Sequence, residues 1–493
     1  MRRLIKNGRV HQAKGNRSIY KAADILLDGE RILEIAPHIP SEAAQEVIDA
    51  ARCIILPGLI NSHIHTFDAF YRGSFDNLPL ELWIMKLRPF LSGLKSTPEY
   101  IRLRTLYNAI QLLKTGSTTV LDDLVQVPWN DADNLAAVFE GYEQAGLRAY
   151  VATTISDLPM HHAIPFLRPV LSDELKQQLE AAGKTPHEVY LSYLREQIAR
   201  YNRPGRIQKY MLSVSGPQRS SIELQRKIRN LAEEHDLPVV NHVMETRLQR
   251  SGAEYAFGKS LIQYMEDNHL LYEQMSVIHA VWIDQHDIDL MAKRGCSVVH
   301  CPGSNFKLGS GISPVEGLLR AGIPVGIGSD NPSCSDNMNL FEQIRLASVI
   351  HKVRHSNFHN WVGAEDALRM ATAGGAHCAR MAHELGSIEV GKQADLIILD
   401  ANSATYIPEN NYTNQIAFCE NGSSVRDVLI AGVPVVRNRE ITTFDEQKVL
   451  DEVMELTDQI HHELKKADEE SRLIMDAFER AYFTAHGMLS YRI

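Results

Sequence analysis

The sequence predicts an α/β fold: a (β/α)8 TIM-type barrel with a small β-sandwich domain formed from both chain ends. Three observations support this prediction. Apolar strand candidates alternate with helical patterns through the middle of the chain, strand-rich pieces lie near both ends, and histidine or acidic residues follow several strands. Alternation of strands and helices is typical of parallel sheets, and barrels carry their functional groups at the C-terminal ends of the strands.

Composition narrows the class of protein. Hydrophobic residues make up 44% and charged residues 23% of the 493 residues, as in soluble globular chains. The net charge of −10 argues against a nucleic-acid or membrane surface held by bulk charge. The first residues lack the apolar stretch of a secretory signal, and no window of 18 apolar residues is present. Six scattered cysteines without a Cys-x-x-Cys pair favour a cytoplasmic protein with free thiols.

The strand-rich ends predict one composite domain from residues 1–57 and 384–442. The first part contains three short β segments, with Asn7-Gly8 and Asp28-Gly29 as expected hairpin turns. A similar pattern returns in residues 386–400 and 425–441. We therefore expect these two separated pieces to form one small β domain.

The middle of the chain, residues 58–383, predicts the barrel. Eight strand candidates occur there: ILPGLINSHIH, STTVLDDL, RAYVATTIS, YMLSVSG, PVVNHV, SVIHAV, SVVHCP and PVGIGSD. The alternative is an open doubly wound sheet, but such a sheet would need a glycine-rich phosphate turn after its first strand, and none is present.

Capping signals mark several helices between these strands. Thr97 precedes Pro98, which suits the start of a helix that Gly116 would close. Ser220 with Glu223, and Ser313 with Glu316, have the spacing of capping boxes. Beyond the late β pieces, residues 443–493 have a charged amphipathic pattern, which predicts a C-terminal helical extension packed on the barrel.

His63-Ile64-His65 ends the first barrel strand. Side chains two residues apart on a strand point to the same face, so these imidazoles could form half of a metal site. Alone the pair is weak evidence for a metal site, because two polar residues at the point where a strand passes into a loop would give the same sequence pattern.

Other strand ends strengthen the metal hypothesis. His242 ends the fifth strand and Glu245 follows it, His279 ends the sixth, and Asp330 ends the eighth. Taken singly, each could be a strand cap, a core histidine, a turn residue or a helix surface residue. Together they should converge on one rim of the barrel, which indicates a metal centre with an additional carboxylate.

The chain resembles the amidohydrolase superfamily, in the branch of mononuclear aminohydrolases acting on nitrogen heterocycles. The resemblance covers about residues 4–440 and is carried by PGLINSHIH, HVMET, SVIHAVW, HCPGSNFKLGSGISPVEGLLRAGIPVGIGSDN and GSIEVGKQADLIILD. It implies metal ligation and catalysis by six residues. The implied ligands are His63, His65, His242 and Asp330, and the implied catalytic residues are Glu245, His279 and Asp330.

The resemblance also bears on the metal. Binuclear relatives have a carboxylated lysine at the end of strand four, where this chain has Ser213 and Ser215; Lys209 lies at that strand's start. We therefore expect one divalent ion, zinc, with Fe(II) as the alternative that the ligand types do not separate. A bound divalent ion lowers the pKa of its water to about 7.

The resemblance implies a hydrolytic deamination of a purine, pyrimidine, pterin or triazine. Asp330 would accept the proton of water, His279 would hydrogen-bond the hydroxide and the developing oxyanion, and Glu245 would protonate the ring nitrogen and then the leaving amine. The products are a ring carbonyl and ammonia. A small heterocyclic substrate, neither nucleic acid nor membrane, is the implied partner, and relatives are often dimers or larger, which implies a homo-oligomer.

Side chains in the loops that follow the barrel strands should determine the substrate specificity. Gln218 stands where nucleoside deaminases of this branch have histidine, which weakens the expectation of an adenosine-type substrate, and Asp330-Asn331 resembles the triazine deaminases more. Asn305 and Trp83 are further candidate contacts, although Trp83 could equally be a core residue. The alternative functions are a chlorohydrolase or cyclic-amide hydrolase of the same superfamily, and a non-catalytic scaffold that would have lost its metal ligands.

Overall fold

The barrel sheet consists of parallel strands that follow one another along the chain. The structure, a computed structural model, describes residues 1–87, 97–126, 128–159, 164, 166–174, 176–177, 185–354 and 356–489. Within these residues the sheet has the order β10-β11-β12-β13-β14-β6-β7-β8-β9. Its strands are β6 (Leu59–Ile64), β7 (Ser117–Leu124), β8 (Arg148–Thr153), β9 (Gln208–Tyr210), β10 (Leu212–Val214), β11 (Val239–Val243), β12 (Met275–His279), β13 (Ser297–His300) and β14 (Val325–Ile327).

The two ends of this strand order, β9 and β10, are consecutive pieces of one predicted strand. β9 pairs with β8 and β10 pairs with β11, and an isolated parallel bridge joins Ile155 to Val214. The sheet therefore returns on itself, and the predicted (β/α)8 barrel is confirmed. Counting β9 and β10 as one, all eight strand candidates lie in it.

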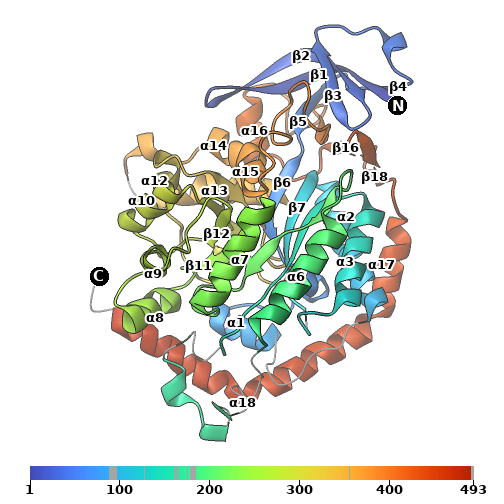
Figure 1. Ribbon diagram of the computed structural model, residues 1–493. Helices are drawn as coiled ribbons and strands as arrows, with labels where there is room; N and C mark the ends of the chain where they lie inside the picture. The colour runs from blue at the N-terminus through green and yellow to red at the C-terminus, as the bar shows by residue number, and fades with distance from the viewer. Residues whose placement is uncertain are drawn as a thin grey trace.

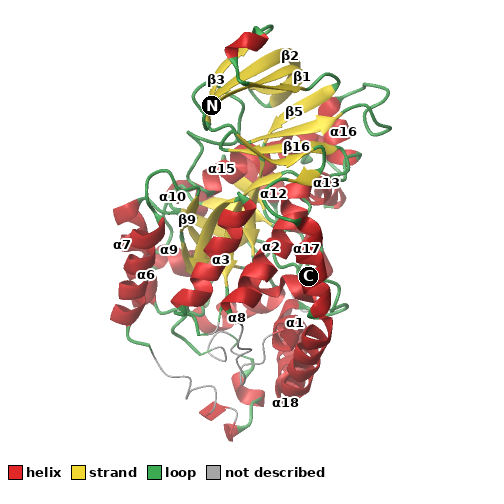
Figure 2. Cartoon of the chain, turned by 90° about the vertical axis from the view of Figure 1, so that its right-hand side faces the viewer, coloured by secondary structure: helices red, strands yellow, loops and turns green. Residues whose placement is uncertain are grey.

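Helices surround the barrel, as Figures 1 and 2 show. Those between β6 and the last barrel strand are α1 (Leu80–Leu87), α2 (Pro98–Lys114), α3 (Ala132–Ala145), α6 (His187–Tyr201), α7 (Ile222–His235), α8 (Arg247–Phe257), α9 (Leu261–Asp267), α10 (Gln285–Arg294), α11 (Pro302–Lys307) and α12 (Val315–Arg320). Later helices are α13 (Leu340–Val349), α14 (Ala364–Arg369), α15 (Gly375–Cys378), α16 (Tyr412–Phe418), α17 (Glu446–Glu455) and α18 (Thr457–Leu489).

Capping signals located two of these helices well and one poorly. The Thr97 side chain accepts a hydrogen bond from the Tyr100 amide at the start of α2, as its position before Pro98 predicts. The cap of α7 is Ser221 rather than Ser220. The capping box expected at Ser313 does not form, because the Ser313 hydroxyl donates to the Ala280 carbonyl 2.9 Å away on a neighbouring loop.

A second sheet, built from both ends of the chain, lies at the top of Figure 1. Its order is β18-β17-β16-β15-β5-β1-β2-β3, with β4 also paired to β1. The strands from the chain's two ends join in this sheet through the antiparallel pairing of β5 with β15. The strands are β1 (Arg2–Lys14), β2 (Arg17–Asp28), β3 (Arg31–Ala36), β4 (Glu46–Asp49), β5 (Cys53–Pro57), β15 (Leu396–Asp400), β16 (Val425–Ile430), β17 (Val433–Arg437) and β18 (Glu440–Ile441).

One of the two predicted hairpin turns in this sheet is wrong. Asn7-Gly8 lies inside the long strand β1, where the register against β2 shifts between Ile5 and Gly8 and Asn7 has a φ of 65°. The dipeptide that often makes a hairpin turn here makes a β-bulge instead. The hairpin expected at Asp28-Gly29 is confirmed, because β2 and β3 pair on either side of it.

Gly58 is the point where the chain passes from the end sheet into the barrel. The first barrel strand candidate, ILPGLINSHIH, begins before the expected domain boundary between residues 57 and 58; in the structure β5 belongs to the end sheet and β6 to the barrel. A Cβ atom at Gly58 would lie 2.0 Å from Oγ1 of Thr118 on β7, so a larger residue would push the two strands apart. Glycine lets the chain cross between the two sheets at this close approach.

The C-terminal helix α18 lies along the bottom of the molecule in Figure 1, beside α1 and α8. Met85 of α1 shares an apolar cluster with Phe478 and Ala481 of α18. Glu463 of the same helix accepts hydrogen bonds from the hydroxyls of Tyr71 and Tyr100, at 3.0 and 2.8 Å. α18 is thus packed against the elements at one end of the barrel. None of the helices in the described ranges is long and apolar enough to span a membrane.

A buried ion pair joins the barrel to the end sheet, and its loss should destabilise the fold. Arg148, at the start of β8, binds Asp395 beside β15 through Nε and Nη2 at 2.8 and 2.9 Å, and both side chains are at most 5% exposed. Replacing Arg148 by Met leaves a buried carboxylate uncompensated, so the free energy of unfolding should fall by about 3–5 kcal/mol in urea denaturation.

The matched control is Arg195→Met, which removes an exposed pair with Glu234. That change should cost less than about 1 kcal/mol. Equal effects of the two substitutions would contradict the structural importance of the Arg148–Asp395 pair.

Candidate active site

The parallel register brings the predicted ligands to one rim. Asp330, after β14, donates its backbone amide to the carbonyl of His63 on β6, 2.9 Å away. On the other side of the barrel, His279 is the register partner of Val243, the residue after His242. Strand ends that are distant in sequence are therefore neighbours in space.

Four imidazoles and one carboxylate meet in the centre of this rim. Nε2 of His63 lies 3.2 Å from Nε2 of His242. Oδ1 of Asp330 lies 3.6 Å from Nε2 of both His63 and His65. The candidate donor atoms of His63, His65 and Asp330 lie within 4.8 Å of one another, as do those of His63, His242 and His279.

The hydrogen bonds around this cluster fit a divalent metal ion. Nδ1 of His65 donates to the Asp123 carbonyl at 2.6 Å, so the lone pair of the neutral ring is on Nε2, the atom that faces the cluster. Three imidazole nitrogens with a carboxylate oxygen are a donor set typical of zinc and related divalent ions. The residues present therefore fit a metal ion.

The protonation states also suit ligation. Burial holds the pKa of His63 and of His242 well below the usual histidine value, which keeps both imidazoles neutral. Burial alone would raise the pKa of Asp330, but electrostatic interactions with His279 and His65 and a hydrogen bond from Ser304 outweigh it and leave that pKa below its ordinary value. Neutral imidazole and ionised carboxylate are the forms that bind metal.

Glu245 lies beside the cluster as a buried carboxyl group with a raised pKa. Its Oε2 is 3.6 Å from Nε2 of His279. Burial, followed by repulsion from Asp330 and Glu81, raises the pKa of Glu245 well above the usual value. A carboxyl group with a raised pKa can donate a proton near neutral pH, which is what a general acid requires.

His279 is oriented from behind by Asn305. Nδ1 of His279 lies 3.1 Å from Oδ1 of Asn305, and with that nitrogen as the donor Nε2 faces the metal cluster. Asn305, expected to contact substrate, is buried and is not among the residues that line the pocket. The geometry gives it the position of a residue that orients His279.

Backbone strain is concentrated where the side chains converge. His279 and Asp330 have φ values of 71° and 65°, and Met244, next to Glu245, has a φ of 58°. Non-glycine residues in this region cost roughly 1–3 kcal/mol each and are common at functional sites.

Asp122 secures the segment that follows His65. Its carboxylate accepts hydrogen bonds from the Thr66 amide at 3.0 Å, from the Thr66 hydroxyl at 2.5 Å and from the Tyr142 hydroxyl at 2.7 Å. All three residues are buried. This support holds the first-strand histidines without taking part in the cluster.

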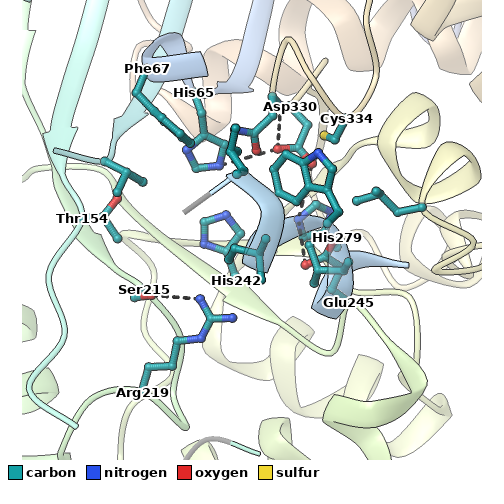
Figure 3. A pocket seen from close by; sticks show the side chains of 17 residues that line it. His65, Phe67, Thr154, Ser215, Arg219, His242, Glu245, His279, Asp330 and Cys334 are labelled. Carbon is teal, nitrogen blue, oxygen red and sulfur yellow. Dashed lines mark hydrogen bonds and ion pairs between the residues drawn. The ribbon is translucent and has the colours of Figure 1, made fainter. Parts of the chain in front are cut away.

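A pocket of about 610 Å³, including its open mouth, lies against the cluster. Trp83, predicted as a substrate contact, lines it from α1, whereas Gln218 is not among the lining residues. Figure 3 shows the pocket's histidines and acidic residues facing one another. The lining consists of His65, Phe67, Leu80, Trp83, Ile84, Leu87, Val125, Thr154, Ser215, Arg219, His242, Glu245, His279, Leu308, Asp330, Asn331 and Cys334.

Several of these residues were not predicted from the sequence. Thr154 and Ser215 directly follow barrel strands, a position that could have identified them. Arg219 lies in a loop with no sequence signal of burial, and the apolar wall of α1 has a pattern common to any packed helix. The pocket is therefore more apolar and more basic than the strand-end residues indicate.

Comparison with known proteins agrees with the site's geometry. A family model described as the amidohydrolase family matches residues 54–435. A 5-methylthioadenosine/S-adenosylhomocysteine deaminase of Thermococcus kodakarensis is 31% identical over 429 residues, 87% of this chain and 92% of that protein. A 5'-deoxyadenosine deaminase of Methanobrevibacter smithii is 31% identical over 432 residues, 86% of this chain and 91% of that protein.

Solved structures share the fold. An adenosine deaminase of Xanthomonas campestris with bound zinc has a TM-score of 0.81 and 25% identity, covering 93% of this chain and 98% of that chain. A triazine hydrolase of Arthobacter aurescens has a TM-score of 0.83 and 23% identity, covering 92% and 99%, and this likeness shows the fold alone.

The cluster predicts a metal requirement. His242→Ala removes one of the converging imidazoles, so the divalent metal content of the purified protein should fall at least several-fold, measured by inductively coupled plasma mass spectrometry. His235→Ala, on the outer helix α7, is the matched control and should retain the metal of the parent. Equal metal content in both variants would refute the assigned cluster.

Proposed function

The chain belongs to the amidohydrolase family, and from that membership we infer how its site performs hydrolytic deamination of a nitrogen heterocycle. The enzyme is a hydrolase of carbon–nitrogen bonds other than peptide bonds, since its relatives are deaminases and its site has the corresponding groups. The reaction replaces an amino group on the ring with a carbonyl and releases ammonia.

The position of Glu245 is the observation that carries the assignment. Water attack on an amino-substituted ring carbon needs a proton on the ring nitrogen and then another on the leaving amine. Glu245 is buried at the pocket wall, has a pKa that burial raises well above its usual value, and lies 3.6 Å from His279. A leaving amine needs a proton more than chloride does, so a carboxyl with a raised pKa at this point favours an amine over the alternative chlorohydrolase.

The other steps of the reaction involve Asp330, His279 and the apolar part of the pocket wall. Asp330 accepts the proton of the attacking water, because its carboxylate is ionised and lies within the cluster. His279, held by Asn305, hydrogen-bonds the attacking oxygen and the charge that develops on it. The apolar wall around Trp83 excludes bulk water from the ring.

The cluster holds a divalent metal ion, which supplies Lewis-acid activation of water when bound. We propose a single zinc ion held by His63, His65, His242 and Asp330. Support for zinc comes from the donor set and from the zinc-bound adenosine deaminase with the same fold. Support for one ion comes from strand four, where Ser215 rather than a lysine lines the pocket. Fe(II) is the alternative ion.

The substrate proposal is an amino-substituted purine, pyrimidine, pterin or triazine that contacts Trp83. The curated relatives are named for adenosine-type substrates, whereas Gln218 departs from the pattern of nucleoside deaminases. We also propose a homo-oligomer, from the family resemblance, and a cytoplasmic location, which the absence of disulfides among the six cysteines supports.

Glu245→Gln should remove the proton donor and keep the shape of the side chain. Ammonia release should fall by about 10²–10⁴-fold, measured over a panel of amino-substituted purines, pterins, pyrimidines and triazines. Metal content should stay at the parent level.

The control is Glu234→Gln on the exposed face of α7, which should leave the rate unchanged. A Glu245→Gln enzyme that releases ammonia at the parent rate would overturn the mechanism.

A further inference from the structure

Arg219 is a basic side chain in the wall of the active-site pocket that the deamination chemistry does not use. It lies between β10 and α7, in the loop after the fourth barrel strand. Figure 3 shows its guanidinium group near Ser215, on the same side of the pocket as His242. Its position allows contact with a substituent of a ring held at Glu245.

The guanidinium is incompletely paired. Nη1 donates to the Ser215 hydroxyl at 3.3 Å, and Nε is buried without a hydrogen-bond partner among the described residues. Within the same residues no carboxylate forms an ion pair with Arg219. Burial lowers the pKa of Arg219, and the nearby carboxyls of Glu245 and Glu81 offset this only in part.

Neither neighbouring carboxyl, as described, lies within ion-pair distance of Arg219. Burial raises the pKa of both Glu245 and Glu81, and Glu81 already accepts a hydrogen bond from the Thr246 hydroxyl at 2.5 Å. Several apolar residues share the pocket wall with Arg219, Phe67, Trp83 and Leu308 among them. Arg219 is half-buried, and a partly desolvated cation in such surroundings is stabilised when a negative charge pairs with it.

We propose that Arg219 binds a carboxylate on the substrate, so that the enzyme's substrate is an amino-substituted heterocycle that carries a carboxylate-bearing substituent. With Nη1 turned to Ser215, Nη2 has no hydrogen-bond partner among the described residues, and a small rotation of the guanidinium would bring the buried Nε beside it as a second, parallel N–H donor for one carboxylate. The inference rests on the proposed deamination, because it places the ring between Arg219 and the metal cluster. It makes Arg219 a specificity residue rather than a catalytic one.

The test compares ligands that differ in the carboxylate. Two pairs are used: S-adenosylhomocysteine with 5'-methylthioadenosine, and pterin-6-carboxylate with pterin. Dissociation constants are measured by calorimetry on metal-loaded Glu245→Gln protein, in which turnover is blocked, with Arg219 intact or replaced by Met or Lys.

With Arg219 intact, the carboxylate member of at least one pair should bind roughly 10- to 100-fold more tightly than the neutral member. Arg219→Met should abolish this preference, and Arg219→Lys should restore only part of it, since lysine lacks the planar pair of donors. Arg226→Met is the matched control, because Arg226 is exposed and bound to the Asn268 carbonyl, and it should keep the full preference.

Three results would overturn the proposal: no binding of any of the four ligands, a preference for the neutral members, or an equal loss of affinity for both members in Arg219→Met. Unchanged metal content and melting temperature of Arg219→Met show that the variant is folded. Ammonia release separates the two proposals. If Glu245→Gln abolishes ammonia release but the preference for the carboxylate ligand is the same with and without Arg219, only the carboxylate inference fails. If the preference depends on Arg219 but no ring releases ammonia, only the deaminase mechanism fails.

Discussion

The parallel ladder of the barrel is the constraint on which the site depends. It places the ends of β6, β11, β12 and β14 on one rim, so that the imidazoles of His63 and His242 come within 3.2 Å of each other although 179 residues separate them. Side chains this polar would be unfavourable in a buried position unless a ligand satisfied them. The strained backbone at His279 and Asp330 and the support of Asp122 both serve the same convergence.

Much of this arrangement follows from short-range patterns in the sequence. The spacing of His63 and His65 predicts a shared face because strand geometry has a period of two residues, and the alternation of strands and helices predicts the common rim. The errors arise where a long-range contact decides the local structure. Ser313 has the spacing of a capping box but donates to Ala280. Asn7-Gly8 could turn the chain but instead bulges within β1, which pairs with β2, β4 and β5.

The pocket wall was less predictable than the metal cluster for the same reason. Arg219 is a loop residue, and loop arginines are ordinarily exposed, so nothing in the sequence marks this one as part of the pocket wall. Asn305 follows a strand, which suggested contact with substrate, yet its side chain lies behind His279. Only the three-dimensional arrangement separates a residue that faces the pocket from one that faces its neighbour.

The packing of α18 on α1 has a consequence for the order in which the site is completed during synthesis. The last residue of the metal cluster is Asp330, whereas α18 begins at Thr457. A growing chain therefore contains every metal-binding residue more than a hundred residues before the helix that backs the wall bearing Trp83. The metal-binding residues are synthesised first and α18, which packs behind the apolar wall of α1, is synthesised last. A chain that stops before α18 would therefore have its metal ligands but a pocket wall without its supporting helix.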